Sequence, residues 1–441
     1  MGVPKFYGAW LRHQKFVKEV SDVNIPADVS DILVDMNSYI YKTANIVYLL
    51  GDNINWNDPS VQARSRWIIE SSQETLEAEH FAAIGNELNK LLNNVSLSIA
   101  RQGQDFHSSH ITGRALINFV LAIDGVAPQA KMMQQRQRRF IAAKERPSKI
   151  NNKFVNAAIT PGTEFMQRLN AYLNSWIQLN RQTLGKKVIY SSHLVPGEAE
   201  HKIMDYLRDG KIKGDGATII HGMDTDLIML SLLSNHPRLY LWREDINLVL
   251  NIDRLRDEIT TMMGREKGYR DFAFIMFFLG NDFLPSQPGL DDYGQSIDKL
   301  IEAYKAANLS LINDQGIIWE NVLIFLEKIK EIEPSLIEHE SQRVFKFNSP
   351  IYEYANKIIQ ISVPRSHGEL QSKVERRKVF DWERFRSAWY SYSLKPRGDM
   401  HLINSILGEN LLQVTPSKIG QMAHQYLIGL NWIYSYYTKG L

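Results

Sequence analysis

Residues 217–226 have the sequence ATIIHGMDTD, in which a short apolar run is followed by two aspartates, Asp224 and Asp226. Similar apolar runs lie at Ile32 to Val34, Ile117 to Ile123, Lys187 to Ser191 and Arg238 to Trp242. Short apolar runs that alternate with helical patterns are typical of α/β domains. The sequence therefore predicts a twisted, mostly parallel sheet flanked by helices.

Acidic residues follow other predicted strands as well. Asp35 ends one strand in DILVDMN, Asp124 ends a second in INFVLAIDG, and Glu198 and Glu200 follow a third in HLVPGEAEH. Because ligands of an open parallel sheet bind outside the carboxyl ends of its strands, we expect these acids to converge on one crevice. A single acid at a strand end more often caps the next helix or faces water.

A convergent set of carboxylates requires cations. Carboxylates about 4 Å apart repel by roughly 1 to 4 kcal/mol per pair at surface-like dielectric. The chain has no cysteine, which excludes disulfides, thiol nucleophiles and Cys-type zinc sites and leaves oxygen ligands and histidine for a metal. Carboxylate oxygens suit Mg²⁺. We expect two such ions about 3.5 to 4 Å apart, which would promote attack of water on a phosphodiester.

A further acid and a basic helix extend this candidate site. Asp282 stands in FFLGNDFLP between turn residues and an apolar segment, an unusual place for a solvated charge. Residues 131–149 hold seven Lys and Arg against Glu145 as the single acid, and Pro128 suits a helix start. One face of this helix would carry Lys131, Gln135, Arg138 and Arg139. An Arg-rich run alone is more often a solvated face or a localisation signal, but beside the acids it predicts a phosphate pocket.

Length and composition limit the overall class. The 441 residues suggest two or three domains. Lys and Arg number 51 and Asp and Glu 49, so the net charge by itself indicates no partner. No apolar run is long enough to cross a membrane. Because the start, MGVPKF, lacks the features of a signal peptide, we expect a cytoplasmic location.

Two regions depart from the strand pattern. Asn45 to Gly113 is polar-rich and contains helix-like segments at Arg64 to Glu77 and Ala82 to Ile99. It predicts a helical insertion or excursion within an α/β core that spans residues 1–300. From residue 301 onward the strand signals fade, and residues 301–441 are predicted to form a mainly helical C-terminal domain.

Taken together, these motifs resemble the XRN family of 5′ to 3′ exoribonucleases. The matching segments follow the family's order between Met1 and Pro285: MGVPKF, LVDMN, AIDGVAPQAKMMQQRQRRF, ITPGTEFM, VPGEAEHKIM, GMDTDLIMLSLL, LYLWRE and FFLGNDFLP. A weaker similarity lies in YLIGLNWIYSYYTKG near the end. The resemblance implies a flap-nuclease (PIN-like) core. It also implies processive hydrolysis of single-stranded RNA with a 5′ monophosphate to nucleoside monophosphates, with Mg²⁺ or Mn²⁺, in RNA and mRNA degradation.

The resemblance also implies roles for individual residues. The catalytic metal ligands would be Asp35, Asp124, Glu198, Glu200, Asp224, Asp226 and Asp282. The 5′ phosphate would be bound by Lys131, Gln135, Arg138 and Arg139, with Lys131 also near the scissile phosphate. Tyr41 stands where the family has a base-stacking His, and an aromatic ring can keep that role. The family's other base-stacking segment would lie beyond Leu441, so either Trp432 or Tyr436 replaces it or the base is held more weakly.

Two other functions remain open. The same superfamily core also serves structure-specific flap endonucleases and DNA 5′ exonucleases, which differ from the XRN family in substrate. A non-catalytic RNA-binding adaptor would keep the fold without hydrolysis, although the intact set of acids argues against it.

Overall fold

The computed structural model describes residues 6–22, 24–50, 54–102, 117–145, 153–211, 215–290, 293–343, 359–362, 377–380, 382–393 and 415–440. Its backbone divides into two compact units. Among the described residues, unit 1 comprises residues 14–259 and 435–440, and unit 2 comprises residues 6–13 and 260–434. The domain boundary near residue 300 stays a prediction.

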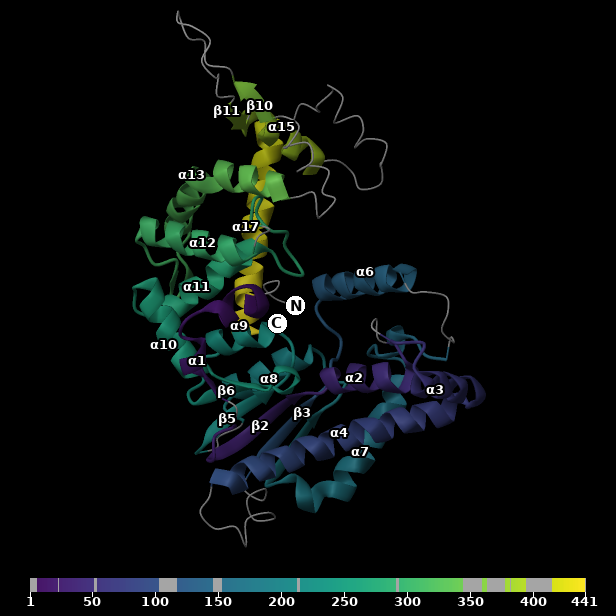
Figure 1. The fold of residues 1–441 in the computed structure, drawn as a ribbon. Coiled ribbons are helices and arrows are strands. Elements are labelled where there is room, and N and C mark those ends of the chain that lie inside the picture. Colours follow the sequence, from purple (N-terminus) through teal and green to yellow (C-terminus); the bar gives the residue numbers. More distant parts are fainter. Residues whose placement is uncertain are drawn as a thin grey trace, which may run out of the picture. The chain divides into compact units, whose positions relative to one another are not determined.

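A seven-stranded sheet forms the centre of unit 1 (Figure 1). In spatial order its strands are β1 (Ser21–Asp22), β7 (Leu248–Asn251), β6 (Leu239–Arg243), β5 (Ala217–His221), β2 (Val29–Asp35), β3 (Asn118–Ala122) and β4 (Lys187–Ser191). The five strands from β6 to β4 pair in parallel, whereas β7 pairs antiparallel with both β6 and β1. The prediction of a mostly parallel sheet is confirmed, and the edge strand β1 and its neighbour β7 are additions to it.

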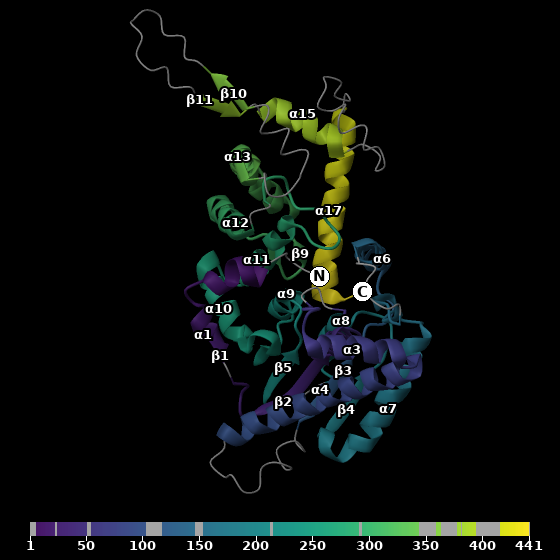
Figure 2. The same ribbon diagram turned by 45° about the vertical axis from the view of Figure 1, so that its right-hand side comes forward.

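Helices cover both faces of this sheet (Figures 1 and 2). The helices that share a hydrophobic core with one face are α2 (Asn37–Tyr48), α4 (Gln73–Gln102) and α7 (Glu164–Leu184). The opposite face carries α8 (Ala199–Arg208), which contacts β2 and β3, and α9 (Asp226–Leu233), which contacts β6. Shorter elements of this unit are α1 (Val17–Val20), η4 (Asn156–Ala158) and η5 (Glu244–Ile246).

The chain between β2 and β3 is helical where it is described. After α2 come α3 (Pro59–Glu70) and the long α4. Asp58 caps α3 by accepting the backbone N–H of Ser60 at 2.8 Å. The expectation of one helical segment from Arg64 to Glu77 is wrong, because α3 ends before Ser71, whose backbone is extended, and α4 starts at Gln73.

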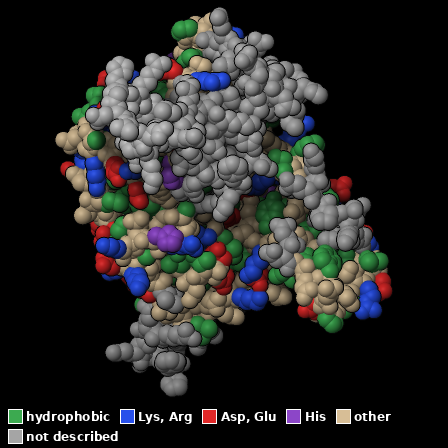
Figure 3. Space-filling model, turned by 45° about the horizontal axis from the view of Figure 1, so that its top comes forward, with side chains coloured by type: hydrophobic (Ala, Val, Ile, Leu, Met, Phe, Trp, Pro, Cys, Tyr) green, Lys and Arg blue, Asp and Glu red, His purple; other side chains and the backbone are tan. Residues whose placement is uncertain are grey.

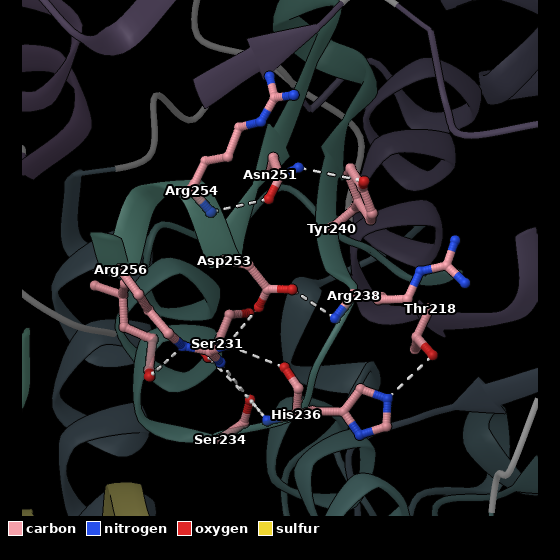
Figure 4. A network of polar contacts seen from close by, with 11 residues as sticks. Thr218, Ser231, Ser234, His236, Arg238, Tyr240, Asn251, Asp253, Arg254 and Arg256 are labelled. Carbon is pink, nitrogen blue, oxygen red and sulfur yellow. Dashed lines mark hydrogen bonds and ion pairs between the residues drawn. The ribbon is translucent and has the colours of Figure 1, made fainter. Parts of the chain in front are cut away.

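A polar network fixes the end of α9 (Figure 4). Arg256, on α10 (Ile252–Met263), donates to the carbonyl oxygens of Ser231 at 2.6 Å and Leu232 at 3.0 Å. It also forms an ion pair with Asp253 at 2.7 Å. A cation at a helix C-terminus satisfies carbonyls that lack partners within the helix. The network therefore holds α9, whose first residue is Asp226.

Unit 2 is mainly helical, as expected for the C-terminal region. Its helices are η1 (Phe6–Trp10), η2 (Leu11–His13), α11 (Gly268–Met276), η6 (Phe277–Leu279), α12 (Tyr293–Ala307), α13 (Trp319–Arg343), α15 (Trp382–Ser393) and most of α17 (Pro416–Lys439). Two antiparallel hairpins, β8 (Ile312–Asn313) with β9 (Gly316–Ile317) and β10 (Ile359–Ser362) with β11 (Arg377–Phe380), were not predicted.

The surface charges and the character of the helices agree with the nearly equal numbers of basic and acidic residues and with the lack of long apolar runs in the sequence. On the face drawn in Figure 3, Lys and Arg side chains are interspersed with Asp and Glu among the described residues. Among the helices in the described part of the chain, none combines the length and apolar character that a bilayer crossing requires.

Candidate active site

Acids gather at one edge of the sheet in unit 1. The neighbouring parallel strands β5, β2, β3 and β4 all end at this edge. Asp35 is the last residue of β2, Glu198 is the N-cap of α8, and Asp226 opens α9. The full set at this edge is Asp35, Asp124, Glu198, Glu200, Asp224 and Asp226.

The pKa values of these acids indicate that they are close to one another. Burial, together with the charges of Asp124, Asp224 and Glu198, raises the pKa of Asp35 to about 8. Burial also raises the pKa of Glu200 well above its usual range, with contributions from the same Glu198 and Asp224 and from Asp226. Since like charges disfavour ionisation only at short range, the structure brings all six acids together.

A chain of hydrogen bonds orients two of the acids. The backbone N–H of Asn37 donates to Asp35 Oδ1 at 3.0 Å, and the Asn37 side chain accepts the N–H of Asp124 at 3.2 Å. Asp124 Oδ1 then accepts the N–H of Ala199, the first residue of α8, at 2.8 Å. A carboxylate at a helix N-terminus is favoured by the unpaired N–H groups there. The loops after β2 and β3 and the start of α8 therefore form one connected scaffold.

Two glycines allow the loops after β3 and β4 to meet. The N–H of Gly125 donates to the carbonyl of Gly197, and the N–H of Gly197 donates to Val126, both at 2.8 Å. A Cβ atom at Gly125 would lie 1.8 Å from the Val195 carbonyl oxygen, and Gly197 has a φ of +101°. Only glycine fits such a close approach and such a backbone angle. The sequence analysis did not single out these glycines, although both stand directly before or after a candidate acid.

Two buried lysines lie among the acids. Lys131 Nζ is 2.9 Å from Glu198 Oε2, and its place in the phosphate pocket stays a prediction. Lys202, on α8, donates to the carbonyls of Ile123 at 2.7 Å and Ser192 at 2.9 Å. Burial lowers the pKa of Lys202 to about 8, while Asp124 acts in the opposite direction. Lys202 was missed in the sequence, where it resembles an ordinary surface residue of an amphipathic helix.

The donor set of this site fits a divalent cation. One ligand atom each from Glu198, Glu200 and His201 lies within 4.8 Å of the others. Glu200 is 6% exposed, and its Oε1 has no hydrogen-bond partner in the described part of the chain. A buried carboxylate oxygen without a partner is unfavourable unless a cation or proton reaches it. A donor set dominated by carboxylates suits Mg²⁺ or Mn²⁺.

The basic helix forms as predicted, and two arginines of its candidate phosphate-binding face lie close to Tyr41. The helix is α6 (Gln129–Glu145). Burial raises the pKa of Tyr41, and the charges of Arg139 and Arg138 and a hydrogen bond from Arg139 oppose that rise. Tyr41 is therefore close to both arginines. Gln135 lies half-buried on the same helix, and its contact with this group stays a prediction.

The remaining candidates divide between the two units. Asp282 belongs to unit 2, where it is half-buried in the turn after η6, and its role as a metal ligand stays a prediction. Tyr436, near the end of α17, belongs to unit 1 and is 1% exposed. Its hydroxyl donates to Glu198 Oε1. Tyr436 is therefore too buried to stack on a base. Trp432 packs edge-on against Phe283 at 4.8 Å between ring centroids, within unit 2.

The sheet order and the acids at its carboxyl edge define a PIN-like α/β domain with an acidic site. A family model described as XRN 5′-3′ exonuclease N-terminus matches residues 1–245. A second, described as Xrn1 helical domain, matches residues 264–379. The chain belongs to the XRN family.

Individual relatives agree with this assignment. The chain is 29% identical over 376 residues to 5′-3′ exoribonuclease 1 of Saccharomyces cerevisiae. The aligned residues cover 75% of this chain and 22% of that protein. It is 26% identical over 527 residues to human 5′-3′ exoribonuclease 1, covering 100% of this chain and 28% of that protein. It is 33% identical over 257 residues to 5′-3′ exoribonuclease 2 of Yarrowia lipolytica, covering 42% of this chain and 25% of that protein. The chain thus spans only about a quarter of the length of these relatives.

Proposed function

We propose that this chain is a processive 5′ to 3′ exoribonuclease that hydrolyses single-stranded, 5′-monophosphorylated RNA to nucleoside 5′-monophosphates. The observation that carries this proposal is the cluster of six acids at the carboxyl edge of the sheet, beside the buried Lys131. The names of the relatives support the direction of hydrolysis and the RNA substrate. We further propose that the chain acts in RNA and mRNA degradation in the cytoplasm.

The acids would hold two divalent cations, Mg²⁺ or Mn²⁺. The ligand set is Asp35, Asp124, Glu198, Glu200, Asp224 and Asp226, and we add Asp282 on the basis of its FFLGNDFLP motif. When bound, such a pair supplies an activated water and stabilises the leaving 3′ oxygen. The protein's own part is to keep the carboxylates oriented through Asn37, Ala199 and Lys131, so that little reorganisation is needed during the reaction.

The 5′ end of the RNA would be bound by α6. Lys131, Gln135, Arg138 and Arg139 would surround the terminal phosphate, because guanidinium groups bind phosphate oxygens with paired hydrogen bonds. Lys131 also lies beside the acids and would contact the scissile phosphate. Tyr41 holds Arg139 through its hydroxyl and offers its ring to the first base. A pocket that fits one phosphate would reject a cap or a triphosphate.

A comparison of 5′ ends tests this function. RNA carrying a 5′ monophosphate, hydroxyl, triphosphate or cap is incubated with the chain in Mg²⁺, Mn²⁺ or EDTA, and product size is measured. We expect mononucleotides from the monophosphate RNA with a divalent cation and no product in EDTA. Cleavage of a flapped substrate, or faster degradation of DNA, would instead support the endonuclease or DNA exonuclease function. RNA binding without any product would support the adaptor.

A further inference from the structure

The last turn of α17 is fixed against α8. Arg208, the final residue of α8, donates to the carbonyl of Thr438 at 3.3 Å and to Asp205 at 2.6 Å. The helix ends at Lys439 and is followed by Gly440, which has a φ of +70°. A Cβ atom there would lie 2.6 Å from the Arg208 guanidinium. Glycine therefore suits this position for its backbone angle and for the space that Arg208 occupies.

The same turn also contacts the other end of α8. The hydroxyl of Tyr436 donates to Oε1 of Glu198, the N-cap of α8. The Tyr436 ring packs against His201, with ring centroids 3.8 Å apart and an interplanar angle of 33°. Tyr436 is 1% exposed and His201 is 5% exposed. Residues near the end of the described chain thus contact both ends of the helix that carries Glu200.

These contacts give the two oxygens of Glu198 separate partners. Oε1 accepts the hydrogen bond from Tyr436, and Oε2 lies 2.9 Å from Lys131 Nζ. The carboxylate cannot rotate without breaking one of the two contacts. Glu200 differs, because its Oε1 has no hydrogen-bond partner among the described residues.

We propose that Tyr436 is a positioning residue for the cation site, which it serves by fixing the orientation of the Glu198 carboxylate beside Glu200. The proposal rests on the proposed function insofar as the acids bind divalent cations. A partner that orients a metal ligand typically contributes 10- to 100-fold to metal affinity or activity. Without the hydroxyl, Glu198 must become ordered when the cation binds, and that ordering weakens binding.

Tyr436→Phe tests this proposal, because it removes the hydroxyl and keeps the ring on His201. Mn²⁺ affinity is measured without RNA, by the electron paramagnetic resonance signal of free Mn²⁺, well below the thermal midpoint of each protein. We expect binding to weaken by about 10- to 100-fold. The kcat for RNA at low Mn²⁺ should fall and recover as Mn²⁺ is raised, with KM for RNA unchanged.

Tyr48→Phe is the matched control. Tyr48 is 2% exposed in the same unit, and its hydroxyl has no hydrogen-bond partner in the part of the chain that the structure describes. The Mn²⁺ affinity of Tyr48→Phe should equal that of the wild type.

Wild-type Mn²⁺ affinity in Tyr436→Phe would overturn the proposal, whether or not the thermal midpoint falls, because a merely structural residue lowers stability alone. The proposed function is judged separately on the wild-type chain. If that chain binds Mn²⁺ but does not hydrolyse RNA, the function fails, while the comparison of Mn²⁺ affinities still decides the role of Tyr436.

Discussion

Asp224 is exposed, whereas Asp35, Glu200 and Asp226 are buried at the same edge of the sheet. Its charge nevertheless raises the pKa of both Asp35 and Glu200. An exposed acid contributes little to packing, and removing it relieves repulsion. A substitution at Asp224 should therefore separate hydrolysis from folding.

We predict that Asp224→Ala lowers the rate of RNA hydrolysis by more than about 100-fold, because a proposed cation ligand is lost, and the loss of a group that only orients such a ligand already costs about 10- to 100-fold. The free energy of unfolding should change by no more than about 0.5 kcal/mol, as for most exposed positions. RNA binding, measured by fluorescence anisotropy in EDTA, should be largely retained. Asp257→Ala is the control, since Asp257 is exposed on α10. Full activity of Asp224→Ala would refute a metal role for this residue.

His80 should make the stability of the protein sensitive to acid. It is 0% exposed and packs against Tyr48, Phe154 and Phe165. Burial lowers its pKa from 6.5 to about 4, despite the hydrogen bond between its Nε2 and the carbonyl of Ile40. The unfolded chain therefore takes up a proton below about pH 6.5, whereas the folded chain does so only near its lower pKa. The stabilisation is fully present above about pH 7 and is lost as the pH falls from 6.5 toward 4.

From these two values, the contribution of His80 to the free energy of unfolding should fall by about 2 kcal/mol between about pH 7.5 and pH 5. His80→Gln should be less stable at neutral pH but should lose about 2 kcal/mol less than the wild type over this interval. Urea unfolding at both pH values measures the difference. Equal losses of unfolding free energy in the two proteins would contradict the prediction that His80 makes the stability sensitive to acid.

The sequence reveals those site residues that stand directly after apolar runs. Asp35 and Asp124 are of this kind, because a strand signal is local and the acid follows it. Tyr436 is not of this kind, because it contacts Glu198, which lies 238 positions away in the sequence. Lys202 also escapes notice, because its partners are backbone carbonyls, which every residue carries.

Among the elements, α6 presents two different faces. Lys131 is 3% exposed and Arg139 is half-buried, whereas Arg136 is exposed. Of the other residues in the predicted phosphate pocket, Gln135 is half-buried and Arg138 is exposed, whereas Arg136 is not part of that pocket. Arg139 and Arg136 carry the same guanidinium group on the same helix, so the effects of substituting them can be compared directly.

Arg139→Ala should erase the preference for a 5′ monophosphate over a 5′ hydroxyl, because the guanidinium proposed to bind the phosphate is lost. The ratio of kcat/KM for the two RNAs measures this preference. Arg136→Ala should leave the ratio as in the wild type. If Arg139→Ala keeps that ratio, or if both variants change it alike, α6 does not bind the 5′ phosphate as proposed.

The elements that could be predicted are those with a clear local pattern. Central parallel strands such as β5 are covered on both faces and form continuous apolar runs. Strands of two residues, such as β1 and β8, carry no readable pattern. The break between α3 and α4 was missed because polar residues there continue a helical pattern until the extended backbone of Ser71 ends it.

At the level of the whole chain, sequence order and spatial grouping differ. Residues 6–13 belong to unit 2, and residues 435–440 belong to unit 1. In unit 2 the rings of Phe6 and Trp10 pack against Phe272, at 6.0 and 5.3 Å between centroids. In unit 1 the end of α17 contacts α8. Such groupings come from long-range packing, which local periodicity does not encode.

We propose that the acids at the carboxyl edge of the sheet hold a pair of divalent cations. Crystals of the chain soaked in Mn²⁺ test it most directly, through anomalous scattering from the metal. We predict two peaks about 3.5 to 4 Å apart, in contact with carboxylates that include Asp35, Glu200 and Asp226. No peak at these residues, or peaks only elsewhere on the protein, would contradict the account.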